Sequence, residues 1–331
     1  MFYAEKCDLC GECLSSCQYL NYDLERAKRE MEELVNGGCP PVVESCVTCV
    51  ACNQVCPKGA NPFDLINERQ EETGALGIPE ESFEKFAQLH NLPTMVFEGD
   101  ADKPAMNLCI VGSMVREQLE GSFFNGLTMV EGADYFCTLG YVHLGRPGLV
   151  KENMARFVKN LTALEKDEII CFHDDCYAAL KVKTKEYGID VPFKVTHLFE
   201  YIANQLKMRK DEIKPVRIKV AYQAPCASRY CPEKDRFLEE IFDLLGVTRV
   251  HRKYDGENGL CCGAPLMARD RARALEIKLK NVEDAVEHGA EAMIFLCPMC
   301  FLNLRKLCRE RNVRPVFISE LCYHALGEKD Y

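Results

Sequence analysis

The chain has 331 residues, of which 47% are hydrophobic, and its formal net charge is −10. The acidic balance argues against a nucleic-acid or anionic-membrane surface, because both partners are bound mainly through lysine and arginine. The 21 cysteines are an odd number and fit poorly with a fully disulfide-bonded secreted protein, so metal ligation explains them better.

The chain begins with two cysteine groups that share the spacing C-x2-C-x2-C-x3-C. The groups are Cys7, Cys10, Cys13 and Cys17, then Cys46, Cys49, Cys52 and Cys56. This spacing is typical of two [4Fe–4S] cubanes, in which the fourth cysteine of each group binds the other cluster. We therefore predict one cubane on Cys7, Cys10, Cys13 and Cys56, and a second on Cys46, Cys49, Cys52 and Cys17. A pair of zinc sites is disfavoured, because zinc motifs use two C-x2-C halves.

A helix is predicted between the two groups, over residues 19–34, because apolar residues recur there at helical spacing before Asn36-Gly37-Gly38. Residues 1–75 are thus predicted to form an α-helical, ferredoxin-type domain. Residues 76–104 are acidic and contain Gly-Ile-Pro and Leu-Pro steps, with one short helix predicted around 81–89. We interpret them as an acidic connector.

Residues 105–331 alternate short apolar runs with helical patterns, as α/β units do. Strands are predicted at 106–111, 168–172, 218–222, 247–251 and 292–296. Helices are predicted at 233–245, 267–288 and 300–311. Cys109 falls inside the first of these strands, so we expect it to be buried.

An internal repeat runs through this region with an offset of roughly 120 residues. Residues 169–180 resemble 294–304, and residues 195–202 resemble 317–325. The repeat predicts two related α/β lobes, 105–210 and 211–331. Together with the helical domain, this gives an α+β two-domain fold.

The second lobe carries its own cysteine set, consisting of Cys226, Cys261, Cys262, Cys297 and Cys300. Intervals of 34 residues separate the first cysteine from the adjacent pair and that pair from the C-P-M-C sequence. Each group lies where a predicted strand ends or a helix begins, so we expect the loops to meet at one edge of the lobe. Soft thiolates there select zinc or an iron–sulfur cluster, or act as redox thiols. A metal site is favoured over a redox dithiol and over packing.

The pattern C…CCG…C-P-x-C resembles the CCG domain of the heterodisulfide reductase family, and the paired ferredoxin motif resembles the C-type subunit of that enzyme. The chain is therefore similar to a fused C-plus-B, or D-type, subunit, and also to the catalytic iron–sulfur subunit of the dissimilatory sulfite-reduction membrane complex. This resemblance implies a noncubane [4Fe–4S] cluster, with zinc as the minor alternative at that site. Its implied ligands are Cys226, Cys261, Cys262, Cys297 and Cys300.

The first lobe keeps only fragments of such a set, so we expect it to lack a noncubane cluster. Cys137 stands at the position of the adjacent pair, and Ser113 lies near the position of the first cysteine. At the C-P-x-C position, His173, Asp175 and Cys176 are candidate catalytic residues, because thiol release needs protons and histidine titrates near neutrality. The alternative is that these polar residues only cap a helix.

No glycine-rich nucleotide motif follows a predicted strand, so electrons are expected from a partner, either a flavin-containing subunit or a membrane cytochrome subunit. The family resemblance implies two cubanes that carry electrons to a noncubane cluster, which reduces a small or protein-borne disulfide or oxidises thiols. The alternative is an electron-transfer adaptor between a flavoprotein and a quinone- or cytochrome-linked partner, without substrate chemistry. An open cavity at the Cys261 and Cys300 loops would favour the first hypothesis.

Neither a signal segment nor a membrane span is predicted: no stretch reaches the length of about 18 apolar residues that a span requires. We therefore expect a cytoplasmic protein, at most peripheral to a membrane complex through its partner.

Overall fold

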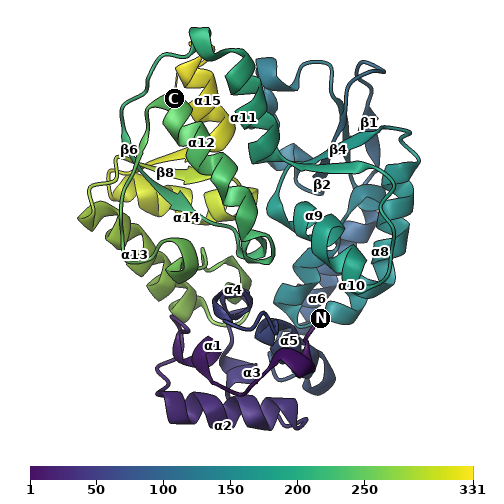
Figure 1. Cartoon of the computed structure of the whole chain (residues 1–331), viewed down its shortest axis with the longest axis vertical. Helices are drawn as coiled ribbons and strands as arrows, with labels where there is room; N and C mark the ends of the chain where they lie inside the picture. The colour runs from purple at the N-terminus through teal and green to yellow at the C-terminus, as the bar shows by residue number, and fades with distance from the viewer. Residues whose placement is uncertain (331) are drawn as a thin grey trace.

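The computed structural model describes residues 1–330 and consists of a helical base below two α/β lobes (Figure 1). The helices of the base are α1 (Glu12–Ser15), α2 (Leu24–Val35), α3 (Val42–Ser45), α4 (Ala51–Val55) and α5 (Pro62–Thr73). The predicted helix over 19–34 begins later than expected, because the Asp23 side chain accepts a hydrogen bond from the Arg26 N–H and caps α2.

The first lobe contains a five-stranded sheet in the order β1-β3-β2-β4-β5. Its strands are β1 (Met95–Phe97), β2 (Ala105–Cys109), β3 (Thr128–Glu131), β4 (Glu168–Cys171) and β5 (Lys194–His197). All neighbouring pairs are parallel except β1 with β3. The strand β1 lies within the range predicted as a connector, where it forms an edge of this sheet.

The helices of this part of the chain precede and connect the strands of the first sheet. They are α6 (Glu80–Ala87), α7 (Arg116–Leu119), α8 (Pro147–Thr162), α9 (Asp174–Ala178), α10 (Thr184–Glu186) and α11 (Leu198–Met208). Helix α6 is the short helix that was predicted around 81–89.

The second lobe contains a four-stranded, fully parallel sheet in the order β7-β6-β8-β9. Its strands are β6 (Lys219–Gln223), β7 (Thr248–Arg249), β8 (Ala292–Phe295) and β9 (Arg314–Phe317). Its helices are α12 (Asp235–Leu245), α13 (Arg271–Glu287), α14 (Pro298–Glu310) and α15 (Ile318–Ala325).

The two lobes have the same strand order once β1 is set aside. Strands β2 to β5 of the first sheet take the same places as β6 to β9 of the second. The repeat seen in the sequence therefore pairs β4-α9 with β8-α14, and β5-α11 with β9-α15. Because the carboxyl ends of parallel strands meet at one edge, each lobe brings its loops together in the same way.

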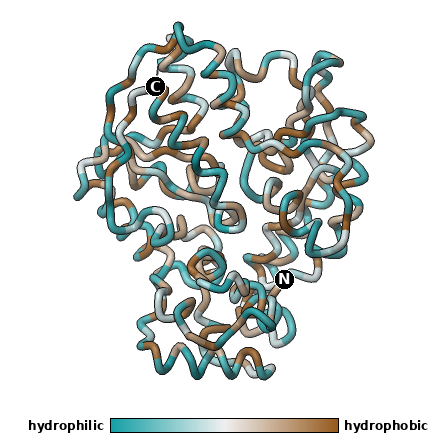
Figure 2. The backbone as a smooth tube through the Cα atoms, in the orientation of Figure 1, coloured by the Kyte–Doolittle hydropathy of each residue, from teal (hydrophilic) through white to brown (hydrophobic). Residues whose placement is uncertain are grey.

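The core is formed by strands that are covered on both faces, as parallel sheets usually are. Every residue of β2 and of β8 is buried. The lobes pack through α11 and α12, where Leu198, Ile202 and Leu238 belong to one continuous apolar cluster. Figure 2 shows hydrophobic colour along the strands, whereas α2 at the bottom alternates between polar and apolar residues. Among residues 1–330, no helix is long and apolar enough to cross a membrane.

Candidate metal centres

The two cysteine groups of the base fold into loops of the same conformation. The second cysteine of each group has a residue of positive φ on either side. Leu9 and Gly11 flank Cys10, and Thr48 and Val50 flank Cys49. Branched side chains rarely adopt this conformation, so the surrounding structure must hold it. In the second loop the Thr48 N–H donates to the Cys46 sulfur at 3.3 Å. The second loop thus directs a backbone donor at a cysteine sulfur.

The first predicted ligand set is brought together across the two groups. Cys56, from the second group, lies near Cys13, Cys10 and Cys7. Burial, together with the charges of these three neighbours, raises the pKa of Cys13. Cys56 of the second group is therefore close enough to Cys13 to act on its pKa, and the crossed ligand sets stay a prediction.

The second predicted ligand set lines one small internal cavity, to which Cys17, Cys46, Cys49 and Cys52 all contribute. Mainly apolar side chains close the remainder of this cavity. Burial raises the pKa of Cys46 to about 11 and that of Cys49 to about 12. Thiols in such a site keep their protons unless a metal replaces them, so the donor set fits a cluster.

The five thiols of the second lobe form a continuous row at the carboxyl edge of its sheet. Cys226 follows β6, Cys261 and Cys262 follow β7, and Cys297 and Cys300 flank the start of α14. The sulfurs of Cys226 and Cys261 are 3.7 Å apart. From there the row continues through Cys262 and Cys300 to Cys297. All are buried except Cys297, which is half-buried.

Gly263 makes the turn after the adjacent cysteines possible. Its φ is +80°, and an added Cβ would lie 2.9 Å from the backbone oxygen of Ala274. Its N–H donates to the Cys261 sulfur at 3.3 Å. The glycine of the CCG sequence is therefore required for both backbone conformation and space.

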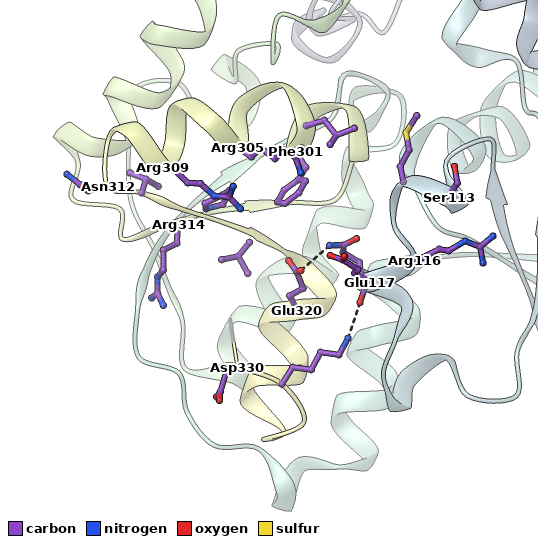
Figure 3. Close-up of a pocket in the computed structure, with 17 residues that line it drawn as sticks. Ser113, Arg116, Glu117, Phe301, Arg305, Arg309, Asn312, Arg314, Glu320 and Asp330 are labelled. Atoms are coloured by element: carbon purple, nitrogen blue, oxygen red, sulfur yellow. Dashed lines mark hydrogen bonds between the residues drawn. The ribbon is translucent and has the colours of Figure 1, made fainter.

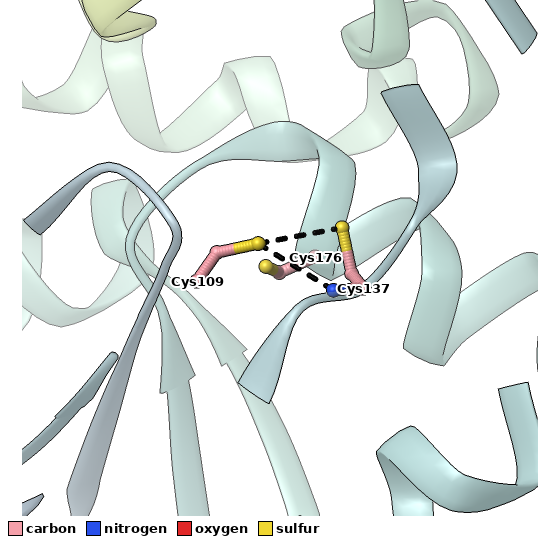
Figure 4. A group of neighbouring side chains, drawn as sticks. All are labelled: Cys109, Cys137 and Cys176. Atoms are coloured by element: carbon pink, nitrogen blue, oxygen red, sulfur yellow. Dashed lines mark hydrogen bonds between the residues drawn. The ribbon is translucent and has the colours of Figure 1, made fainter. Parts of the chain in front are cut away.

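Three thiols of the first lobe also converge, and Figure 4 shows them. The sulfurs of Cys109, Cys137 and Cys176 lie within 4.8 Å of one another, and all three residues are buried. They come from the ends of β2, β3 and β4, which match the strand ends that carry the set of the second lobe. Cys109, rather than Ser113, supplies the thiol at the first of these ends.

His173 completes this first-lobe group. Its Nε2 lies 3.8 Å from the Cys176 sulfur, and the Cys109 and Cys137 sulfurs are 3.8 Å apart. Although burial opposes both shifts, hydrogen bonds from Cys137, Cys176 and His173 lower the pKa of Cys109, and the bond to Cys109 helps to raise the pKa of His173 to about 9. Sulfurs around one tetrahedral zinc lie about 3.8 Å apart, so this donor set suits a single ion or a dithiol pair.

His143 is a polar residue of the site that the sequence did not reveal. It lies in the short helix Leu139–Leu144, and its Nδ1 is 3.0 Å from the Thr48 hydroxyl of the base. The charges of Asp175 and Cys262 act on its ring, but burial has the larger effect and lowers the pKa of His143. The His143 ring therefore stays neutral near pH 7. Because groups of both lobes act on it, it lies near the interface between them.

Asp175 and His173 also lie in the first lobe, on the side that faces the second lobe. Burial raises the pKa of Asp175, although the charges of His173 and His143 oppose this effect. Cys297 of the second lobe is among the groups whose charge acts on His173. The first lobe thus presents titratable groups toward the thiol row of the second.

This chain resembles known proteins, and part of the resemblance lies in the region of the second-lobe cysteines. A model of the cysteine-rich CCG domain matches residues 220–305, which include all five thiols of the second lobe. Over 98% of the chain, the sequence is 25% identical to the D-type subunit of dihydromethanophenazine:CoB–CoM heterodisulfide reductase from Methanosarcina mazei, 94% of which is covered. The chain contains a CCG domain and is similar over nearly its whole length to the D-type subunit of heterodisulfide reductase. The resemblance inferred from the motifs is therefore confirmed.

Two further relatives extend this comparison. The chain is 24% identical to the B-type subunit of fumarate reductase (CoM/CoB) from Methanothermobacter marburgensis, over 95% of this chain and 70% of that one. The solved structure of a hypothetical protein from Helicobacter pylori matches with a TM-score of 0.59 at 16% identity, covering 95% of this chain and 70% of that one. The chain shares its fold with the Helicobacter pylori protein. The similarity to a fumarate reductase subunit supports an electron-transfer subunit of an oxidoreductase complex that has redox partner proteins.

A cavity lies between the lobes, away from the thiol row (Figure 3). It measures about 860 Å³ and is lined by residues 113–118 of the first lobe and by residues of α14 and β9. A hydrogen bond of 3.0 Å from Gln118 to Glu320 joins the lobes at this point. None of the five cysteines of the CCG set lines the cavity.

Proposed function

We propose that this chain carries electrons through two [4Fe–4S] cubanes of the base to a noncubane [4Fe–4S] cluster in the second lobe, where a disulfide is reduced or thiols are oxidised. The observation that carries the proposal is the row of five thiols, four of them buried, close to Cys49 of the base. Fewer thiols would suffice for a single tetrahedral ion. A row of five instead suits a multi-iron cluster.

The cluster, when bound, supplies iron that accepts the sulfur of a substrate. Reduction of a disulfide to two thiols consumes two electrons and two protons, and the first lobe is placed to provide the protons. Asp175 is suited to this role because burial raises its pKa, so its carboxyl keeps a proton at higher pH than an exposed aspartate. His143 lies beside it as a neutral base.

Of the three catalytic candidates from the sequence, His173 and Asp175 keep their proposed task, whereas Cys176 takes another. Asp175 and His173 face the thiol row and supply protons. The Cys176 sulfur, which accepts a hydrogen bond from Asn107 Nδ2 at 3.5 Å, lies 3.8 Å from His173 Nε2. We assign Cys176 to holding the His173 ring, within the first-lobe thiol group.

A second candidate function is the electron-transfer adaptor, which passes electrons between a flavoprotein and a quinone- or cytochrome-linked partner. The burial of four of the five thiols favours it, as does the position of the large cavity away from them. A disulfide reductase would need a substrate to approach the row at Cys297, which alone among the five thiols is half-buried. Partner subunits carrying flavin or a membrane cytochrome fit both functions.

The reaction of the oxidised protein with thiols separates the two candidates. A disulfide reductase should form a paramagnetic adduct at the second-lobe cluster, detected by electron paramagnetic resonance (EPR) of the anaerobic protein. Cys262→Ala should abolish the adduct and leave the cubane signals unchanged. Cys308→Ala is the matched control, because Cys308 is buried in the same lobe but contacts Met293 instead of the thiol row.

A broad panel of thiols and disulfides that leaves this cluster's spectrum unchanged in the parent complex would favour the adaptor. Retention of the adduct in Cys262→Ala would place the reaction elsewhere in the protein.

A further inference from the structure

Arg229 lies at the contact between the base and the second lobe, and only 4% of its surface is exposed. It follows Cys226 in the loop after β6. Its guanidinium donates to the backbone oxygen of Cys49 at 3.2 Å and to that of Gly259 at 2.5 Å. One planar group therefore binds the loop of the second cubane set and the loop that leads to Cys261.

The charges around Arg229 come from sulfur and phenol groups. Among residues 1–330, no carboxylate oxygen lies within the 4.0 Å of an ion pair with this guanidinium. A buried arginine without a carboxylate is costly unless another negative charge stabilises it. Thiolates of Cys49, Cys226 and Cys261 are placed to do so, since their charges raise the pKa of Arg229 against the effect of burial.

Arg229 also keeps one donor free. Its Nε is buried and has no hydrogen-bond partner within the described residues. Such unsatisfied buried donors are rare in native proteins and call for a missing partner. A sulfur of either neighbouring centre has the acceptor chemistry that this N–H lacks.

Tyr19 forms a second link between the same two loops. It lies two residues after Cys17, a predicted ligand of the second cubane, and its hydroxyl accepts a hydrogen bond from the Cys261 N–H at 2.6 Å. The charges of Cys49 and Cys261 both act on Tyr19. The two cysteine sets are therefore joined through fixed groups of this chain at two points.

We propose that Arg229 is a positioning residue for electron transfer between the second cubane and the CCG cluster, as a fixed cation shared by both centres. The proposal rests on the proposed function, because both clusters must be bound. A shared cation favours the reduced, more negative form of each centre, so it raises both reduction potentials.

The shared position also suits the transfer step itself. The transferred electron is attracted to Arg229 while it is on the second cubane and again after it has reached the CCG cluster. The attraction lost at the first centre is therefore recovered at the second. Its hydrogen bonds hold the guanidinium in place, so little reorganisation accompanies the transfer. No proton moves at Arg229, because a guanidinium stays charged.

Redox titration of the holoprotein, followed by EPR, tests this role with three variants. Arg229→Gln should shift the reduction potentials of both the second cubane and the CCG cluster to more negative values. Arg229→Lys keeps the positive charge, so both potentials should stay close to those of the parent protein. Arg269→Gln is the matched control. Arg269 binds the backbone oxygens of Glu44 and Cys46 on the same base, but no CCG cysteine is among the charges that act on it. It should leave the CCG potential unchanged.

An unchanged CCG potential in an iron-replete Arg229→Gln protein would overturn the proposal. Equal shifts in the lysine and glutamine variants would also overturn it, because they would assign Arg229 to packing alone. If the glutamine variant does not bind iron, Arg229→His gives the same comparison, since both potentials should fall as pH rises through the histidine pKa and a flat profile contradicts the role. A parent protein without a CCG-cluster signal would instead reject the proposed function.

Discussion

Individual residues hold the thiol loops in conformations that ordinary sequences avoid. Thr48, Val50 and Cys109 all have positive φ, and such strain is found where function requires a fixed geometry. Gly263 avoids this strain because it has no Cβ. The loops thus combine tolerated strain with positions, such as Gly263 and Gly11, at which only glycine fits.

Gly263→Ala should destabilise the CCG loop by more than the usual cost of about 1–2 kcal/mol for a left-handed residue, because its Cβ also meets the backbone oxygen of Ala274 at 2.9 Å. Gly289→Ala is the control, since Gly289 has a φ of +75° but no atom within 4 Å of its added Cβ. We expect a lower thermal midpoint in both variants and loss of iron only in the first. Equal iron content in the two would contradict the assigned role of Gly263.

Residues that act within local motifs could be predicted, and those assembled by the fold could not. The eight cysteines of the base follow a fixed local spacing, from which the two ligand sets were predicted, and the structure places Cys56 near Cys13 and lines one cavity with Cys17, Cys46, Cys49 and Cys52. Cys109 and Cys137 are 28 residues apart without any common motif, so only the fold brings their sulfurs to 3.8 Å. His143 is a single histidine in an apolar segment and carries no local signal. The comparison of the lobes placed Cys137 and Cys176 at positions of the second-lobe set, but nothing in the sequence joined Cys109 to them.

Elements with long apolar runs were predicted close to their true bounds. Strands β2, β4, β6, β7 and β8 lie where such runs occur, as does α12, which ends at Gly246 in the left-handed conformation. Strands β3, β5 and β9 were missed; β5 and β9 begin with an exposed lysine or arginine, which shortens their apolar run. Strand β1 was missed because its residues are largely exposed at a sheet edge.

At the scale of the whole molecule, a buried ion cluster joins the base to the first lobe. Lys183 of the first lobe pairs with Asp64 of α5 and, at 2.9 Å, with Glu186. Although burial opposes it, the charge of Lys183 and its hydrogen bond lower the pKa of Asp64. This contact therefore ties the position of the base to the protonation of one carboxyl group.

The stability contributed by Asp64 should be present above about pH 4, near its unfolded pKa, and should be lost as pH falls through its lower folded pKa. Asp64→Asn should cost about 1.5–3 kcal/mol near neutrality, as expected for a hydrogen bond to a charged group. It should also weaken the acid dependence of the thermal midpoint. Asp190→Asn, at an exposed position of the first lobe, is the control. The same acid profile in both variants would contradict this prediction.

In the proposed function, the two cysteine sets of the base and the row in the second lobe form one path for electrons, and the hydrogen bonds of Arg229 and Tyr19 join its last two sets. The central claim is that this path contains three iron–sulfur clusters. The most direct measurement is the iron and acid-labile sulfide content of the anaerobically purified protein. We predict about twelve of each per chain, four for each cluster. About eight of each, as from the base alone, would contradict the claim and remove the CCG cluster from the account.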